Sequence, residues 1–442
     1  MTQNPRKAAV NILMEIEKNS AYTNIEMNKI RAHGSFSESD IRFIGELVNG
    51  VQKRKLTLDY IITFHSSVKL NKISPFILAV LRLGVYQILY MDRVPDSAAV
   101  NESVKIIKKS SVSRLSGYVN AVLRAVDGSE LTNLDKNKPE DMSKIYSIPE
   151  WIVSRWLNIF GYDFTVELLD AFSASSNLCI RRSPDIDGCS LQLKLAQEGI
   201  EIEPFVIKGF ENFDYCYSVK SSDKPLTSTR SFQEGDFYIQ DPAASFAAYL
   251  LEPNEGETVI DMCAAPGGKT VFIAQLLKNK GEVFAFDIYD HKIALISQNC
   301  NRHKLTVVKP KIQDASCYNP EFEEIADKIM CDVPCTGFGL MRKKPDIRYT
   351  RKEEDIASLA SLSRKILDNA SKYLKKGGVL VFSTCTIEPL ENEKTIETFL
   401  TDHKDFSLYP FGDNVSYKTF YPNVDNTDGF FVCRLKKNGV PK

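Results

Sequence analysis

The sequence has no long uninterrupted apolar run and contains only two tryptophans and five histidines among its 442 residues. The longest apolar stretch, FILAVLRLGVYQILYM from Phe76, includes Arg82 and Gln87 and is shorter than the roughly 18 uninterrupted residues that a membrane-spanning helix needs. The first residues, up to Asn19, place apolar side chains at helical spacing between charges, unlike the continuous apolar centre of a secretory signal. We therefore predict a buried helix at residues 76–91 and a cytoplasmic protein without membrane contact.

Cysteine pairs at metal-binding spacing are also missing. The ten cysteines form no CxxC pair, and the five histidines are scattered along the chain, so the spacing typical of a zinc site is absent. A chain of this length does not depend on disulfides, and unpaired cysteines are typical of a reducing compartment. We expect ten free thiols and no metal.

Charge is distributed unevenly. Residues 1–130 contain 18 Lys and Arg against 12 Asp and Glu, whereas the rest of the chain has an excess of acidic residues. A modest positive excess is commonly only a solvated surface, but on a separate helical domain it is also what a phosphate-binding module needs. The chain is long enough for about three domains.

The periodicity of apolar residues divides the chain into three predicted domains and one linker. Helical periodicity runs from Pro5 to about Val126, and the polar segment from Ser129 to Asp141 lacks it. From Asp236, short β-rich runs alternate with amphipathic helices, a pattern typical of a parallel sheet covered on both faces. We predict an α/β protein with four segments: a helical domain at 1–130, a linker at 131–147, a small α+β unit at 148–234 and a parallel-sheet domain at 235–442.

Acidic residues and glycines follow the predicted strands of the last domain, at the edge where such folds bind ligands. The first strand leads into DMCAAPGGKT, residues 261–270, whose glycines let backbone amides approach a ligand ahead of a helix N-terminus. Asp287 closes the next strand about twenty residues later, as a ribose-binding carboxylate would. Asp314 and Asp332 close the next two strands. A single such aspartate is commonly a helix N-cap, but four in succession favour a cofactor site.

Two other classes of protein remain alternatives to an enzyme with a Rossmann-like cofactor loop. In a P-loop, GxxxxGK[ST], Gly268, Lys269 and Thr270 would fit, but Cys263 occupies the first glycine position and compromises the phosphate cradle. A P-loop enzyme would also need a magnesium-binding aspartate and would have no use for Cys385. The other alternative is a non-enzymatic RNA-binding or assembly factor with the same fold. Loss of the thiols of Cys335 and Cys385 would have indicated such a protein, and both are present.

Two of the ten cysteines lie where a thiol can react. Free cysteines are mostly buried and inert, and Cys179, Cys331 and Cys433 lie inside strand-like runs where that description fits. Cys335, in DVPCTG, and Cys385, in FSTCT, each follow a strand among Pro, Thr and Gly residues. We therefore expect both thiols to face the same cleft as the cofactor loop.

Together these motifs resemble one enzyme family. DMCAAPGGKT, DVPCTGFG, RKKPDIRYT, FSTCT with IEPLENE, and the closing DGFFVCRL look like the S-adenosylmethionine-dependent RNA 5-methylcytosine methyltransferases with two active-site cysteines. The basic helical front end with SGYVNAVLRAV is similar to the NusB-type RNA-binding domain of the branch that methylates bacterial 16S ribosomal RNA. The resemblance covers nearly the whole chain. It implies a Rossmann-like domain with a mostly parallel seven-stranded sheet.

The resemblance also implies roles for individual residues. Cys385 would add to carbon 6 of the target cytosine, and Cys335 would help to free the product. Asp332 would bind the base and border the cofactor, S-adenosylmethionine. Asp287 would bind the ribose, and Asp314 would lie on the adenine side. The methionine end would be wrapped by Cys263, Ala264, Ala265, Pro266, Gly267, Gly268 and Lys269.

The chemistry explains why a thiol is needed. Carbon 5 of cytosine is too weak a nucleophile to accept a methyl group until a thiolate adds at carbon 6 and makes the ring enamine-like. An unperturbed thiol, with a pKa of about 8.5, is only a few per cent thiolate at neutral pH. Lys269 and the positive sulfonium of the cofactor are two candidates for stabilising the thiolate.

The resemblance points to cytosine 967 of small-subunit ribosomal RNA as the target, although neighbouring branches modify other sites with the same catalytic residues. We expect a monomer that acts on 16S ribosomal RNA or a small-subunit assembly intermediate, on a base that can be unstacked. RKKPDIRYTRK, residues 342–352, is either a solvated connection or a contact with phosphates beside that base. QDPAAS, residues 240–245, matches the family but is equally a strand-to-helix N-terminus. LCIRRSP departs from the Arg-x-Asn pattern common among relatives.

Overall fold

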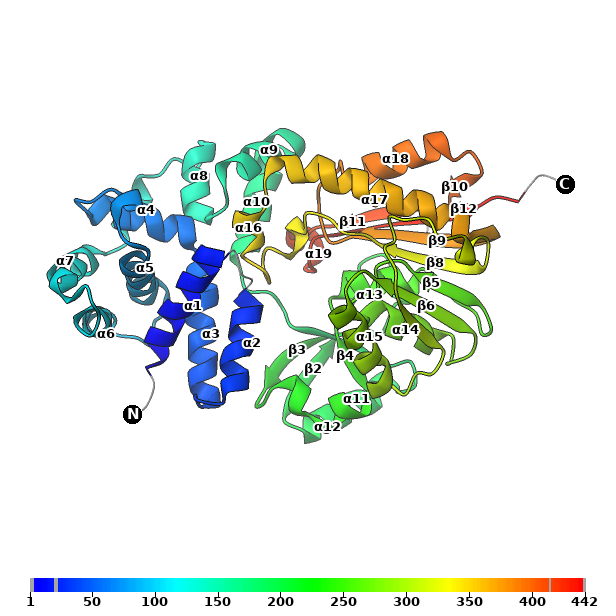
Figure 1. The fold of residues 1–442 in the computed structure, drawn as a ribbon, viewed down its shortest axis with the longest axis horizontal. Helices are drawn as coiled ribbons and strands as arrows, with labels where there is room; N and C mark the ends of the chain where they lie inside the picture. Colours follow the sequence, from blue (N-terminus) through cyan, green and yellow to red (C-terminus); the bar gives the residue numbers. More distant parts are fainter. Residues whose placement is uncertain (1–3, 20–22, 413–414, 440–442) are drawn as a thin grey trace. The chain divides into compact units, whose positions relative to one another are not determined.

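The structure is a computed structural model that describes residues 4–19, 23–412 and 415–439. The chain divides into two compact units, whose elements are labelled in Figure 1. The helical unit extends to Ala174 and also includes residues 343–351. The second unit contains Ser175–Arg342 and the chain from Lys352 onward.

The helical unit extends beyond the predicted domain at 1–130, because residues 131–174, part of which were predicted to belong to the small α+β unit at 148–234, also lie in it. Its helices are α1 (Pro5–Asn19), α2 (Thr23–His33), α3 (Glu38–Lys53), α4 (Lys55–His65), α5 (Pro75–Tyr90), α6 (Asp96–Lys108), α7 (Ser116–Ala125), α8 (Pro139–Tyr146), α9 (Glu150–Phe160), α10 (Tyr162–Ser173) and α16 (Ile347–Thr350). The polar joint before α3 forms a capping box, in which Ser37 and Asp40 satisfy each other's backbone N–H groups.

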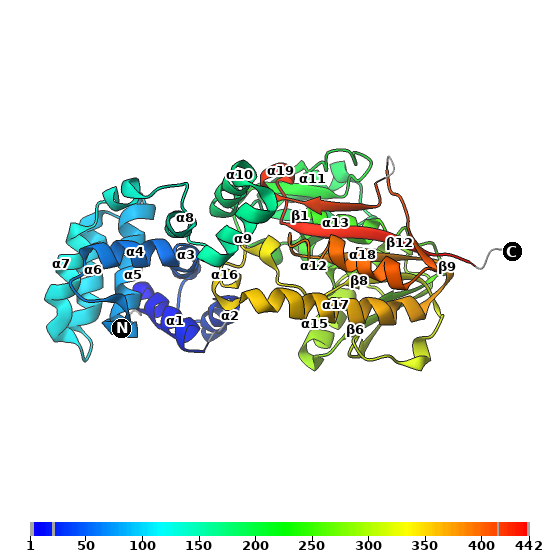
Figure 2. The same cartoon turned by 90° about the horizontal axis from the view of Figure 1, so that it is seen from above.

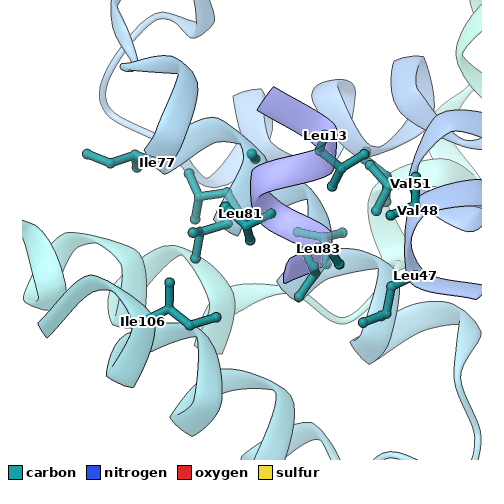
Figure 3. Packing of buried hydrophobic residues seen from close by; sticks show 14 of the residues in the cluster. Leu13, Leu47, Val48, Val51, Ile77, Leu81, Leu83 and Ile106 are labelled. Carbon is teal, nitrogen blue, oxygen red and sulfur yellow. The ribbon is translucent and has the colours of Figure 1, made fainter. Parts of the chain in front are cut away.

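Helix α5 is the centre of the helical unit, which confirms the predicted buried helix. It packs against α1, α3, α4, α6 and α7, so apolar residues are buried around most of its circumference. Figure 3 shows Leu81 and Leu83 of this helix among Leu13 of α1, Val48 of α3 and Ile106 of α6. Burial of each such side chain contributes about 1.5–3 kcal/mol, so this cluster dominates the stability of the unit.

The predicted linker at 131–147 is partly helical, because it contains α8. Pro139 occupies the first turn, where its missing N–H costs nothing, and Glu140 and Asp141 lie beside the positive end of the helix dipole. Met142 and Tyr146 are buried within the unit. The helix was missed because it is short and its polar residues outnumber these two apolar contacts.

The basic stretch at 342–352 is not a solvated connection throughout, because Arg342 and Arg348 are buried, and Arg348 is not a phosphate contact. The Arg348 side chain is fully buried, and burial lowers the pKa of its guanidinium to about 10. It donates hydrogen bonds of 3.0–3.3 Å to the carbonyl oxygens of Lys53, Tyr146, Ser147 and Phe172. The guanidinium therefore holds segments of the helical unit together and is not available to RNA.

The second unit contains a small antiparallel sheet with the strand order β2-β3-β1-β4. Its strands and helices are β1 (Cys179–Arg182), α11 (Gly188–Gln197), β2 (Ile200–Pro204), β3 (Cys216–Ser222), α12 (Arg230–Glu234) and β4 (Phe237–Ile239). β4 lies beyond Asp236, where the parallel-sheet pattern was expected to begin, and it pairs with β1. The first strand of the large sheet is therefore β5.

The large sheet has the order β10-β12-β9-β8-β5-β6-β7, and β11 pairs with β12. The strands are β5 (Thr258–Asp261), β6 (Glu282–Asp287), β7 (Val308–Ile312), β8 (Ala326–Asp332), β9 (Leu374–Thr384), β10 (Phe406–Leu408), β11 (Tyr417–Phe420) and β12 (Phe430–Lys437). β7, β6, β5, β8 and β9 run parallel, whereas β12 runs antiparallel to β9. The mostly parallel sheet is confirmed, with eight strands in the described residues where seven were expected.

Helices cover both faces of the large sheet (Figures 1 and 2). They are α13 (Pro242–Tyr249), α14 (Gly268–Leu276), α15 (Asp290–Arg302), α17 (Glu353–Tyr373) and α18 (Glu393–Asp402), and the short helix α19 (Pro422–Asp425) precedes β12. Alternate residues of β8 show the two faces: Ile329 and Cys331 pack with α17 and α18, whereas Met330 packs with α13 and α14. This arrangement leaves the carboxyl ends of the strands as the open edge.

Candidate active site

Three of the four predicted aspartates close strands at this edge. Asp261, Asp287 and Asp332 are the last residues of β5, β6 and β8. Asp314 differs, because β7 ends at Ile312 and the aspartate lies two residues beyond it in a turn. There its carboxylate accepts hydrogen bonds from the backbone and hydroxyl of Ser316, which lower its pKa.

A cavity of about 280 Å³ opens at the carboxyl ends of β5, β6, β7 and β8. It is lined by Met262, Cys263, Ala265, Asp287, Ile288, Lys292, Gln313, Asp314, Ala315, Asp332, Val333, Pro334, Leu362 and Ile366. The lining therefore combines the carboxylates of Asp287, Asp314 and Asp332 with apolar side chains of α17. A lining that is both apolar and acidic suits a nucleoside.

A second cavity of about 200 Å³ continues from the first and shares Cys263, Ala265 and Asp332 with it. Its other walls are formed by Tyr238, Ile239, Gln240, Asp261, Ala264, Pro266, Gly268 and Lys269. The residues of the predicted cofactor loop thus divide between two contiguous cavities. An elongated ligand with a nucleoside at one end and a charged group at the other would fit such a pair.

The cofactor loop has little room for side chains. Gly267 has a φ of 104°, a conformation that favours glycine, and a Cβ on Gly268 would lie 2.9 Å from the Tyr238 ring and 3.0 Å from Gln240. Helix α14 begins at Gly268. Cys263 lies in the same loop, and burial raises the pKa of its thiol well above the usual value. Cys263, which lines both cavities, therefore stays a neutral thiol.

Asp261 is an unusual carboxyl group because it is buried and only partly satisfied. Thr270 Oγ1 donates to its Oδ2 at 2.6 Å, whereas Oδ1 accepts no hydrogen bond from any residue that the structure describes. Burial raises its pKa to about 7. A cation reaching this cavity would find an acceptor oxygen without a partner, and its charge would favour the ionised carboxylate.

Lys269 and Asp332 form an ion pair where the two cavities meet. Lys269 Nζ lies 2.7 Å from Asp332 Oδ2, and Ser383 Oγ donates to Oδ1 of the same carboxylate at 2.6 Å. Burial alone lowers the pKa of Lys269, but the charges of Asp332, Asp261 and an ionised Cys385 raise it above the usual value. The ammonium is therefore positively charged, and its charge interacts favourably with an ionised Cys385.

The two predicted cysteines meet across neighbouring strand ends. Cys335 Sγ lies 3.3 Å from Cys385 Sγ, so the structure brings the two thiols together, but neither cysteine lines the two cavities around the cofactor loop. Cys385 is half-buried, but Cys335 is only 7% exposed, which is more buried than its loop position suggested. Its hydrogen bond with Cys385, together with burial, raises the pKa of the Cys335 thiol. Cys179, Cys331 and Cys433 are buried in strands, as expected.

The closing DGFF motif supports the cysteine loops. Phe430 lies under Lys269, with Nζ 5.3 Å from the ring centroid. Gly429 donates from its backbone to the carbonyl of Gly339, and Gly339 in turn donates to the carbonyl of Cys385 at 3.1 Å. A Cβ on Gly339 would lie 1.7 Å from the carbonyl oxygen of Gly429, so the two backbones can approach only because both residues are glycine.

Gly339→Ala is therefore expected to lower the free energy of unfolding by about 1–3 kcal/mol through this backbone clash. Urea unfolding followed by circular dichroism measures the change. Gly117→Ala is the control, because a Cβ there meets no atom within 4 Å. Equal stability of the Gly339→Ala variant and the wild type would contradict the close packing of these loops.

Arg181 and the QDPAAS segment, which were not among the predicted site residues, also shape the site. Arg181, in LCIRRSP, is buried and donates to Gln240 Oε1 and, at 2.9 Å, to the carbonyl oxygen of Gly268 in the cofactor loop. Gln240 lines the second cavity, and Asp241 caps α13 through its side chain, so QDPAAS is both a helix start and part of the wall. Arg182 is also buried and pairs with Asp214 at 2.9 Å. Its pairing with Asp214 leaves LCIRRSP without an exposed arginine for RNA.

Within the described ranges, no helix is long and apolar enough to span a bilayer, and no group of three His, Cys, Asp or Glu side chains could hold a metal ion.

Two crystal structures have related folds. One, of the protein PH0851, is 26% identical and superposes with a TM-score of 0.81, covering 99% of this chain and all of that one. The other, described as a methyltransferase homolog protein from Pyrococcus horikoshii, is 28% identical with a TM-score of 0.59 and covers 68% of this chain and 98% of that one.

The sheet, its covering helices and the two cavities define a Rossmann-like S-adenosylmethionine-dependent methyltransferase. The sequence profile described as "16S rRNA methyltransferase RsmB/F" matches residues 248–436, and that of the NusB family matches residues 3–127. A Bacillus subtilis protein described as "Probable ribosomal RNA small subunit methyltransferase B" is 34% identical over 98% of this chain and 99% of its own. A Photorhabdus laumondii "Ribosomal RNA small subunit methyltransferase B" is 30% identical over 91% and 92%. The chain belongs to the ribosomal RNA small subunit methyltransferase B family.

Proposed function

We propose that this enzyme methylates carbon 5 of a cytosine in 16S ribosomal RNA through a covalent bond between Cys385 and carbon 6 of the base. The family resemblance points to cytosine 967 as the target. The observation that carries the proposal is the pair of thiols 3.3 Å apart beside the Lys269–Asp332 ion pair. A methyltransferase acting on a base nitrogen or a ribose oxygen would have no use for two thiols. The enzyme would act in the cytoplasm as a monomer.

S-adenosylmethionine, which supplies a methyl group carried on a sulfonium, fits the two cavities. Asp287 and Asp314 would hold the ribose and the adenine side in the larger cavity, and the loop from Cys263 to Lys269 would hold the methionine end. The unpartnered Oδ1 of Asp261 is a ready acceptor for the methionine ammonium group. Lys269 lies in the same cavity, where its charge suits the carboxylate.

Cys385 is the nucleophile in this mechanism. Its thiolate forms a bond to carbon 6, and the electron pair of the C5=C6 bond becomes available at carbon 5. Lys269 stabilises the thiolate before attack, because its ammonium is charged and interacts electrostatically with an ionised Cys385. Asp332 accepts a hydrogen bond from the exocyclic amine or the protonated ring nitrogen of cytosine, so charge that develops in the ring is compensated.

Cys335 completes the reaction. After methylation, carbon 5 carries one proton too many, and its removal restores the C5=C6 bond as the sulfur of Cys385 leaves as a thiolate. Because the two sulfurs are neighbours, a base whose carbon 6 is bonded to Cys385 has carbon 5 within reach of Cys335. Cys335, as a thiolate, accepts that proton, directly or through water, and the methylated base is released.

The helical unit contributes a site for the phosphates of the RNA. A cavity of about 530 Å³ lies within it, between α2, α3 and the segment 343–346. Four basic side chains line this cavity, Arg31, Arg42, Lys343 and Lys344, against two acidic ones, Glu46 and Asp346. The basic side chains outnumber the acidic ones, and both oxygens of the Asp346 carboxylate already accept hydrogen bonds from Thr23. Lysines and arginines around such a hollow bind phosphates without reading sequence.

Lys343→Ala with Lys344→Ala is expected to weaken RNA binding about tenfold and to reduce the slope of log affinity against log salt by about 1 to 2. Titration of a labelled 16S ribosomal RNA fragment at several salt concentrations measures both quantities. Lys136→Ala with Lys138→Ala is the matched control, because both lysines are exposed in the same unit but lie outside the cavity. An unchanged salt slope in the Lys343 and Lys344 variant would place the phosphates elsewhere.

Bisulfite mapping of 16S ribosomal RNA from cells with and without the gene tests the proposed function. The expected result is one protected cytosine that becomes convertible when the gene is deleted and is protected again on complementation. A complete 5-methylcytosine pattern without the gene would contradict the proposal.

A further inference from the structure

The two cysteine loops are joined by a hydrogen-bond network behind the sulfur atoms. A threonine follows each cysteine, and the hydroxyls of Thr336 and Thr386 lie 2.9 Å apart. Both threonines are fully buried. These buried hydroxyls therefore fix the spacing between Cys335 and Cys385 without any contribution from the cofactor or the RNA.

Glu391, in the IEPLENE segment, is the acceptor in this network. Its Oε1 accepts the backbone N–H of Thr336 at 2.7 Å, and its Oε2 accepts the Thr336 hydroxyl at 2.5 Å. The next residue, Asn392, donates to the carbonyl of Thr386 at 3.0 Å and accepts the hydroxyl of Thr384. Adjacent residues thus hold the backbone after Cys335 and the backbone around Cys385.

We propose that Glu391 is a positioning residue for product release: its carboxyl group fixes the Cys335 loop so that the Cys335 thiol stays beside the sulfur of Cys385. This inference rests on the proposed covalent mechanism and adds a residue to it. Glu391 is fully buried behind the thiols, so it acts through Thr336 and does not touch the base.

The charge of Glu391 also affects Cys335. Burial raises the pKa of Glu391 to about 7, although the hydrogen bonds from Thr336 oppose the shift, and nearby Glu388 raises the pKa further. An ionised Glu391 in turn raises the pKa of Cys335, together with Asp332. Ionised Glu391 therefore disfavours the Cys335 thiolate, whereas neutral Glu391 does not. The groups that face this carboxyl are Thr336, Thr386, Glu388 and Cys335.

The test separates formation of the covalent adduct from its release. Glu391→Ala is expected to form adduct with a 16S ribosomal RNA fragment and S-adenosylmethionine at a rate within about threefold of the wild type, but to release it about 10–100-fold more slowly. Denaturing gels of single-turnover reactions report the adduct, and tritium transfer reports methylation. Glu397→Gln, an exposed glutamate on α18, is the control and should match the wild type.

The pH profile of release distinguishes positioning from a general loss of structure. Glu391→Gln keeps an acceptor for the Thr336 N–H but cannot ionise. Its release rate should equal that of the wild type below pH about 7 and exceed it above that pH, where the wild-type carboxylate opposes the Cys335 thiolate. If the release rates of Glu391→Gln and the wild type changed in parallel at all pH values, the inference would be wrong.

A second variant covers the case in which Glu391→Ala does not fold. Thr336→Val removes the hydroxyl that binds Oε2 and leaves the backbone bond, so adduct should again accumulate. If either variant slows formation and release equally, Glu391 is a structural residue only and the inference is wrong. If the wild type forms no adduct at all, the covalent mechanism itself fails, which is a different result.

Discussion

Cys385→Ala is expected to abolish methyl transfer, lowering the single-turnover rate by at least about 10⁴-fold, because the variant lacks the sulfur that bonds to carbon 6. Such a loss corresponds to at least about 5 kcal/mol of transition-state stabilisation. Transfer of a tritiated methyl group to 16S ribosomal RNA measures the rate. The variant should still bind the cofactor and the RNA, because Cys385 lines neither cavity of the cofactor site.

Cys189→Ala is the matched control, since Cys189 is an exposed thiol on α11 in the same unit. It should keep wild-type activity and should not change adduct formation. Calorimetric titration with S-adenosylhomocysteine shows whether the Cys385→Ala protein retains its cofactor site. An active Cys385→Ala variant with normal cofactor binding would refute the assignment of the nucleophile.

The order of strands and helices could be predicted from local patterns. In the second unit, β5, β6 and β8 end at the aspartates that mark them, because buried parallel strands appear as short apolar runs that stop at a polar residue. Helix α5 could be predicted for the same reason, as its apolar residues cover most faces. β4 and β11 could not be predicted, because they have only three and four residues and the sheet to which each belongs depends on its partner strand.

The candidate site also has features that could be predicted from the sequence and features that could not. Strand ends in a parallel sheet meet at one edge, so the proximity of Cys335, Cys385 and Lys269 follows from topology, and the thiols lie 3.3 Å apart. The burial of Arg348 and Glu391 could not be predicted, because a charged residue in a polar stretch looks solvent-exposed. Their partners come from distant segments, such as the carbonyls of residues 53 and 172 around Arg348. Burial of charge is decided by tertiary packing, which local composition does not encode.

Whereas Cys385→Ala is expected to block methyl transfer, Cys335→Ala is expected to block release of the product. This variant keeps the nucleophile, so Cys385 can still bond to carbon 6 and the methyl group can still be transferred once. Without the Cys335 thiol, the carbon 5 proton has no nearby acceptor, and turnover should fall by about 10²–10⁴-fold. The bound RNA should then appear as a slowly migrating band on a denaturing gel.

The adduct identifies which sulfur carries the base. The band should disappear in the double variant Cys335→Ala with Cys385→Ala, because the trapped bond is made by Cys385. Digestion and mass spectrometry of the band should find the nucleotide on the peptide that contains Cys385, and carbon 5 of that nucleotide should already be methylated. A nucleotide on another cysteine would reverse the roles of the two thiols. Rapid turnover of the Cys335→Ala variant without a band would show that a different group removes the proton.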